Sequence, residues 1–202
     1  MKKIRRSIED GFPVMNFPDK VESLNLRDGY DAASIKQLIS DGRWAIGGYL
    51  EKRNKMYTAP QYENRRNIHM GVDIWAPANE PVFAPVRGCI AYKAYHDQTG
   101  NYGGTLVIHH DLNGESLFAL YGHLSKSSVD EAVIGKRVDA GDILGRLGGW
   151  NENGNWPPHL HLELSERDPG VADMPGVVAD DEVEKAKELY PNPKLLIGDW
   201  YS

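Results

Sequence analysis

The chain contains a single cysteine, Cys89, so no intrachain disulfide can form and a disulfide-stapled scaffold is excluded. Cys89 lies in an apolar, strand-like stretch, which predicts a buried small side chain rather than a catalytic thiol. Apolar runs are also short. None reaches the roughly 18 residues that a bilayer-spanning helix requires, so we expect no membrane span.

An excess of positive charge is also absent, and the chain is mildly acidic instead. The chain has 23 Lys and Arg residues against 29 Asp and Glu residues, whereas a protein that binds nucleic acid needs a basic face. The first residues are basic, as in a signal peptide, but Glu9, Asp10 and Pro13 stand where its apolar segment should follow. We therefore expect no nucleic-acid partner and a cytoplasmic protein, with an extracytoplasmic location left open. The sequence indicates no particular protein partner.

Short strand patterns dominate residues 74–164, where glycine and proline separate apolar segments and helical periodicity is almost absent. The candidate strands are residues 82–92, 106–109, 117–123, 133–138, 143–147 and 160–164. Strands spaced this closely predict a mainly β fold, with an antiparallel sheet core folded over on itself.

Short helices are predicted near both ends of the chain. The elements are a helix over residues 32–40 capped by Asp31, a strand over 44–50, a helix from Asp180 to before Pro191, and an extended tail over 191–198. We divide the chain into an N-terminal preface packed on the core (residues 1–67) and a main domain with the C-terminal helix and tail (residues 68–202).

One strand carries an unusual set of polar side chains. In Trp156-Pro157-Pro158-His159-Leu160-His161-Leu162-Glu163-Leu164, polar and apolar residues alternate with a period of two, as in a half-buried strand. His159, His161 and Glu163 then share one face, and the leucines share the other. Two imidazoles held in one direction on a rigid strand indicate a metal site.

Two further segments offer additional ligands. His69 and Asp73 are four residues apart around Gly71, so on an extended chain they lie on the same face. His123 follows at the end of Leu120-Tyr121-Gly122-His123-Leu124-Ser125. Of the seven histidines, four therefore lie in these three segments. We expect His96 to face solvent.

The three segments, in this order, resemble those of the LytM/lysostaphin-type zinc metallopeptidases. The resemblance covers about residues 68–166 and includes the connecting patterns at 81–88 and 141–145. It implies a lysostaphin-type, barrel-sandwich-like fold with one Zn²⁺ per chain. The end of the chain, with Pro175-Gly176-Val177, also resembles such domains fused to pyridoxal-phosphate-dependent aminotransferases.

The resemblance also implies roles for individual residues. It assigns His69, Asp73 and His161 as zinc ligands, and His123 and His159 as catalytic histidines. In several relatives a tyrosine shortly before the first motif stabilises the reacting centre, and both Tyr57 and Tyr62 are candidates here. Glu163 shares a strand face with His161 and is a candidate for fixing an imidazole tautomer.

Three functions fit these residues to different degrees. The leading hypothesis is a zinc metallopeptidase that cleaves a peptide amide bond with metal-activated water. Its alternative is a non-catalytic LytM-like binding or regulatory module, but that requires a damaged site, and all five positions are intact. A cupin-type iron or manganese site would use the H-x-H-x-E run alone and leave His69, Asp73 and His123 without a role.

The substrate is less defined than the metal. The family acts on peptidoglycan cross-links, whereas the lack of a visible export signal favours a small peptide or an imported muropeptide. The loop Trp150-Asn151-Glu152-Asn153-Gly154-Asn155-Trp156 is bulkier than the small-residue loop usual in the family, and Pro157-Pro158 replaces its Gly-Pro. Which histidine is the general base, and whether the preface blocks the site, stay open.

Overall fold

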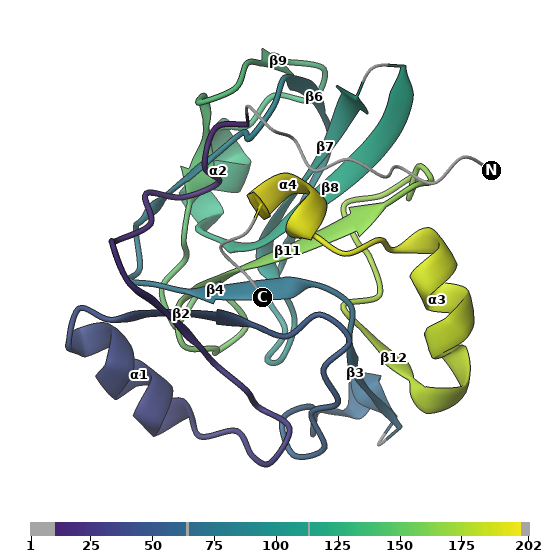
Figure 1. Ribbon diagram of the computed structural model, residues 1–202. Helices are drawn as coiled ribbons and strands as arrows, with labels where there is room; N and C mark the ends of the chain where they lie inside the picture. The colour runs from purple at the N-terminus through teal and green to yellow at the C-terminus, as the bar shows by residue number, and fades with distance from the viewer. Residues whose placement is uncertain (1–10, 64, 113, 199–202) are drawn as a thin grey trace.

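The computed structural model describes residues 11–63, 65–112 and 114–198. Its largest element is an eight-stranded sheet, shown in Figure 1. In spatial order the strands are β1 (Val21–Ser23), β2 (Trp44–Gly47), β4 (Val72–Trp75), β11 (His159–Ser165), β8 (Glu115–Leu124), β7 (Gly103–Leu112), β6 (Gly88–His96) and β9 (Arg137–Val138). All neighbours are antiparallel except the edge pair β1–β2, which is parallel. The predicted mainly β class is confirmed.

Two small sheets and several short helices complete the described chain. The sheets pair β5 (Pro81–Phe83) with β10 (Ile143–Arg146), and β3 (Arg66–His69) with β12 (Val177–Ala179). The helices are α1 (Ala32–Ser40), α2 (Lys126–Glu131), α3 (Val183–Leu189) and α4 (Lys194–Ile197), with 3₁₀ turns at Pro60–Tyr62 and Asp180–Glu182. Within the described ranges, no helix has the length and hydropathy needed to cross a bilayer.

Strand β11 lies between β4 and β8 and brings the three polar segments together. His161 lies opposite Asp73 of β4 on one side and Gly122 of β8 on the other. Leu160, Leu162 and Leu164 are fully buried in the main core, as the alternation predicted. Burying each leucine stabilises the fold by about 1.5–3 kcal/mol, and a slip of one residue would move all three out of the core, so the register is strongly specified.

Near the N-terminus the predicted helix is confirmed, whereas the strand predicted over 44–50 ends at Gly47. Asp31 accepts a hydrogen bond from the Ala33 N–H at 3.0 Å and caps α1, which ends before Gly42 with a φ of +75°. The helix buries Ile35. Near the other end, the acidic residues Asp180–Glu182 form a 3₁₀ turn that leads into α3, and this helix ends before Pro191 as predicted.

Three predictions of local structure were wrong. The strand over 82–92 is divided into β5 and β6, because the chain turns at Pro85, which has no N–H to donate to a ladder. Of residues 133–138 only Arg137–Val138 form a strand, since Gly135 takes a φ of +84° in a turn. The tail is not extended over its whole length, because Lys194–Ile197 form α4 and bury Leu196 and Ile197.

Two further features differ from expectation. Helix α2 was not predicted; it is a short helix that Ser125 caps by accepting from the Ser128 N–H. Cys89 and His96 both lie in β6 and are partly buried rather than buried and solvent-facing, respectively. His96 donates to the Ala172 carbonyl at 3.1 Å through Nε2, which places it against the chain before β12.

Candidate metal centre

Three donor atoms from three strands meet at one point. His69 is the last residue of β3, Asp73 lies in β4 and His161 in β11, and each side chain is almost wholly buried. His69 Nε2 lies 3.0 Å from His161 Nδ1, and Asp73 Oδ1 lies 3.2 Å from the former and 3.1 Å from the latter. Within the described chain these three residues form a cluster able to hold a metal ion.

The spacing of the donors fits a small tetrahedral cation. Ligand atoms about 2.0–2.1 Å from a tetrahedral zinc ion lie about 3.3 Å apart. The three observed separations of 3.0, 3.1 and 3.2 Å are close to that value. Two imidazoles and one carboxylate are also a donor set that zinc prefers, and they leave one tetrahedral position for water.

The outer nitrogen of each imidazole in the cluster has its own acceptor. His69 donates from Nδ1–H to the Gly48 carbonyl at 3.0 Å, which leaves the Nε2 lone pair toward the cluster. His161 donates from Nε2–H to Glu163 Oε2 at 3.2 Å, which leaves the Nδ1 lone pair toward it. Such acceptors hold the tautomer and the ring orientation that a metal requires. The contact with His161 supports the candidate role of Glu163 in fixing an imidazole tautomer.

Charge in the cluster is arranged around one ionised carboxylate. Burial opposes ionisation of Asp73, but the His69 imidazole and the Arg53 guanidinium hold its pKa well below the ordinary value. Burial, together with Arg53, lowers the pKa of His69 to about 3, so this ring is neutral. For His161, burial is outweighed by the hydrogen bonds to Asp73 and Glu163, which raise its pKa to about 9. A proton and a metal ion therefore compete for His161 Nδ1.

Arg53 is a residue of the site that the motif pattern did not reveal. Its Nη1–H donates to Asp73 Oδ2 at 2.6 Å, its Nε–H donates to Glu51 Oε2 at 2.6 Å, and the side chain is 1% exposed. The available signal was Glu51-x-Arg53, an acid and a base two residues apart and therefore on one face of an extended segment. Charged pairs in polar stretches are usually solvated, so this spacing alone does not predict a buried contact.

His123 and His159 present their nitrogens to the same cavity. Each donates from Nδ1–H to a backbone carbonyl, His123 to Asn153 at 2.9 Å and His159 to Pro157 at 2.8 Å, so each Nε2 is left with a lone pair. The two rings are 4.1 Å apart between centroids, and His159 Nε2 lies 3.8 Å from Asp73 Oδ1. Burial lowers the pKa of His159 to about 4 and that of His123 well below its ordinary value, so both rings are neutral at neutral pH and keep an unprotonated Nε2.

The backbone at His123 is unusual. His123 has a φ of +62°, a conformation that costs a non-glycine residue about 1 kcal/mol or more, and its N–H donates to the Tyr102 carbonyl at 2.9 Å. His159 is held differently, because its ring stacks on Trp75 with centroids 4.0 Å apart. Both imidazoles are therefore fixed by the fold before any substrate is present.

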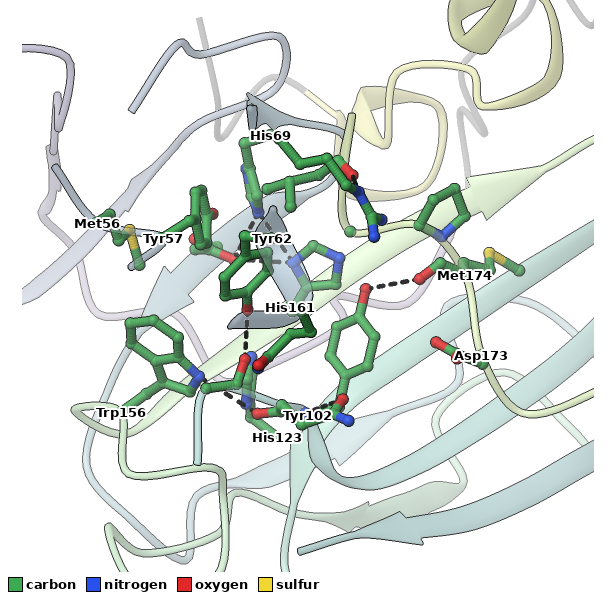
Figure 2. Close-up of a pocket in the computed structure, with 18 of the residues that line it drawn as sticks. Met56, Tyr57, Tyr62, His69, Tyr102, His123, Trp156, His161, Asp173 and Met174 are labelled. Atoms are coloured by element: carbon green, nitrogen blue, oxygen red, sulfur yellow. Dashed lines mark hydrogen bonds and ion pairs between the residues drawn. The ribbon is translucent and has the colours of Figure 1, made fainter. Parts of the chain in front are cut away.

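A cavity of about 420 Å³ opens beside the donor atoms. Figure 2 shows side chains that line it, among them His69 and His161. One wall is aromatic: the Tyr57 ring is tilted against Tyr62, with centroids 4.9 Å apart, and meets Trp156 edge to face, with centroids 6.3 Å apart. Tyr102, missed in the sequence, forms part of the other wall and donates to the Met174 carbonyl at 3.1 Å. Trp156 belongs to the bulky loop noted in the sequence, so that loop does shape the cavity.

The two candidate tyrosines are bonded differently. Tyr62 donates its hydroxyl hydrogen to the Gly100 carbonyl. Tyr57 accepts from Arg53 Nη1–H at 3.0 Å and so retains its own hydrogen for another acceptor. Burial raises the pKa of both hydroxyls, that of Tyr62 to about 12, so both are protonated at neutral pH.

The fold is mainly β and its His69, Asp73 and His161 cluster could hold a metal ion, and comparison with known families extends this description. The profile of Peptidase family M23 matches residues 67–172, more than half of the chain, and the chain belongs to that family. The resemblance to LytM/lysostaphin-type endopeptidases seen in the sequence is thereby confirmed.

Curated relatives match the same part of the chain. Endolysin 2638A of Staphylococcus phage 2638A is 35% identical over 101 residues, which are 50% of this chain and 19% of the relative. The DD-carboxypeptidase/endopeptidase Mpg of Neisseria meningitidis serogroup B is 34% identical over 96 residues, 48% of this chain and 20% of the relative. The chain spans about a fifth of the length of these relatives.

Solved structures with similar folds include two catalytic domains. That of the prophage-encoded M23 protein EnpA from Enterococcus faecalis, a single-residue mutant, is 25% identical, with a TM-score of 0.47 over 68% of this chain and 89% of that chain. That of lysostaphin from Staphylococcus simulans is 20% identical, also with a TM-score of 0.47, over 78% of this chain and 98% of that chain.

Proposed function

We propose that the protein is a zinc-dependent metallopeptidase that hydrolyses a peptide amide bond. The observation that carries this proposal is the triangle of donor atoms from His69, Asp73 and His161, with edges of 3.0–3.2 Å, beside two further imidazoles whose Nε2 atoms face the same cavity. When bound, zinc would acidify a water molecule and polarise the substrate carbonyl.

The histidines outside the triangle supply proton transfer. His159 and His123 are neutral, and each keeps its Nδ1–H on a backbone carbonyl, so each can accept a proton at Nε2 without reorienting. One of them takes the proton of the attacking water, and the pair can return it to the leaving amine. The assignment of the base between the two stays open. Peptide hydrolysis needs both steps, and two neighbouring rings 4.1 Å apart can serve them.

Tyr57 is the better candidate for stabilising negative charge on the substrate oxygen. Tyr57 lines the cavity, and its hydroxyl accepts from Arg53 and still has a hydrogen to donate, whereas the Tyr62 hydrogen is held by the Gly100 carbonyl. A donor that is already oriented toward a developing oxyanion lowers the barrier by about 3–4 kcal/mol.

A peptidoglycan-derived peptide is the substrate class that we favour, because the names of the relatives describe an endolysin and a DD-carboxypeptidase/endopeptidase. A small soluble peptide is the variant that a cytoplasmic location would require. The location, the division of the chain near residue 67 and the kinship of its tail to aminotransferase-fused domains stay predictions.

The test combines metal binding with cleavage. Purified protein loaded with zinc is incubated with muropeptides and glycine-rich peptides, and products are followed by mass spectrometry. We expect one zinc per chain and cleavage that a chelator abolishes and zinc restores, with both lost in Asp73→Ala and His161→Ala. Stoichiometric zinc without chelator-sensitive cleavage would favour the non-catalytic binding module instead, and absence of zinc would refute the metal centre.

A further inference from the structure

The carboxylate of Asp73 is divided between two tasks. Its Oδ1 faces the donor triangle, 3.1 Å from His161 Nδ1 and 3.2 Å from His69 Nε2. Its Oδ2 accepts from Arg53 Nη1–H at 2.6 Å and is therefore engaged on the side away from the two imidazoles. An aspartate can bind a cation through one oxygen or through both, and this contact withholds the second oxygen.

Arg53 is in turn held in place on its other edge. Its Nε–H donates to Glu51 Oε2 at 2.6 Å, and Glu51 Oε1 accepts from the Leu26 N–H at 2.9 Å. Both charged side chains are buried, with 1% and 7% of their surface exposed. The guanidinium thus has little freedom to turn away from Asp73, because a single movement would break two buried ion pairs.

Burying Arg53 with two carboxylates costs free energy, which argues that its role is more than filling space in the core. Arg53 Nη2 is buried without a hydrogen-bond partner among the described residues. An unsatisfied buried donor is destabilising, and buried ion pairs can often be replaced by apolar residues without loss of stability. A fork-shaped side chain is required only if two carboxylates have to be held at once, which lysine cannot do with the same geometry.

We propose that Arg53 is a positioning residue that restricts Asp73 to one-oxygen coordination and so preserves an open ligand position for water. The inference rests on the proposed zinc site. Arg53 lies outside residues 67–172, the range that the M23 profile matches, so part of the metal centre comes from the preceding segment. Gly48, whose carbonyl accepts from His69, belongs to this segment too.

The test reads the metal itself rather than cleavage. Zinc affinity is measured by competition with a chromophoric chelator, and the coordination number by visible absorption after cobalt substitution, since four-coordinate Co²⁺ absorbs more strongly than five- or six-coordinate Co²⁺. In Arg53→Met we expect zinc affinity to fall about 10–100-fold and the cobalt absorption to weaken as the second oxygen of Asp73 becomes available. In Arg53→Lys, zinc affinity and cobalt absorption should lie between those of Arg53→Met and those of the unmodified protein.

A matched control and a second variant keep the test decisive. Arg43 is paired with both oxygens of Glu22 at 2.6 Å on the surface of the same segment, so Arg43→Met should leave both readouts unchanged. Should Arg53→Met not fold, Glu51→Gln/Arg53→Met removes the unpaired charge at Glu51 and is measured instead.

The possible outcomes separate the two proposals. A folded Arg53→Met protein with unchanged zinc affinity and cobalt absorption, or with lower stability alone, would overturn the positioning role while leaving the zinc site intact. If the unmodified protein bound neither metal stoichiometrically, the proposed function itself would fail, and the inference with it.

Discussion

Replacing Gly48 with alanine should damage the metal centre from the backbone side. Gly48 has a φ of +114°, and its carbonyl accepts the hydrogen bond that orients His69. A Cβ added there would lie 2.1 Å from Arg53 Nη2 and 2.7 Å from His69 Nδ1, both far inside van der Waals contact. Either the backbone must rotate away or one of these two side chains must move.

The magnitude follows from what must give way. A positive φ in a residue with a Cβ costs about 1–2 kcal/mol. Moving Arg53 away strains its two ion pairs of 2.6 Å to Glu51 and Asp73, and breaking a buried pair costs about 3–5 kcal/mol. We therefore expect Gly48→Ala to lower the free energy of unfolding by about 4 kcal/mol or more. Because His69 is reoriented, zinc affinity should also fall about 10–100-fold.

Gly42→Ala is the matched control for this prediction. Gly42 also has a positive φ, +75°, but nothing lies within 4 Å of an added Cβ, so this variant carries the backbone cost alone, about 1–2 kcal/mol. Urea unfolding of the two proteins and chelator competition for zinc give both quantities. Equal stability and equal zinc affinity in the two variants would refute the reasoning, because Arg53 and His69 would then move aside without a cost in free energy.

Three further outcomes are expected. His110 is buried, and burial lowers its pKa to about 4, so below pH 6.5 a proton binds the unfolded chain more readily than the folded one. The free energy of unfolding should therefore fall by up to about 3 kcal/mol between pH 6.5 and pH 4. Urea unfolding over this pH range should show a smaller loss in His110→Gln. Glu163→Gln should lower the His161 pKa from about 9 in metal-free protein, measured by NMR titration, and weaken zinc binding about 10-fold; an unchanged pKa would deny Glu163 its role. Tyr57→Phe should reduce kcat of the zinc-loaded protein about 100-fold, against a small effect of Tyr62→Phe, and the reverse order would reassign the stabilising hydroxyl.

Much of the fold and most of the candidate site could be predicted because their signals are local. The alternation around His161 places three leucines in the core and three polar side chains on the other face, and the strand has that geometry. Asp31 caps its helix through a contact two residues away. Such features depend on residues that are close together in the chain, so a local sequence pattern is sufficient to predict them.

The errors arose where packing overrode a local pattern. Residues 133–138 have the composition of a strand, yet Gly135 turns the chain and only two residues pair with β6. The tail reads as extended after two prolines, yet burial of Leu196 and Ile197 stabilises a helical turn there. Neither the partner strand nor the buried surface is visible in those few residues.

The residue types and short spacings of the three motifs indicate a metal site, and the resemblance to a family assigns its candidate ligands. Their convergence cannot be derived from the sequence, because His69 and His161 are 92 positions apart. The register of β4 against β11 places Asp73 opposite His161, and His69 joins them from the end of β3. The contacts of Arg53 and Gly48 could not be predicted from the sequence either. Their side-chain and carbonyl directions depend on a buried backbone path that is stable only once the whole core has formed.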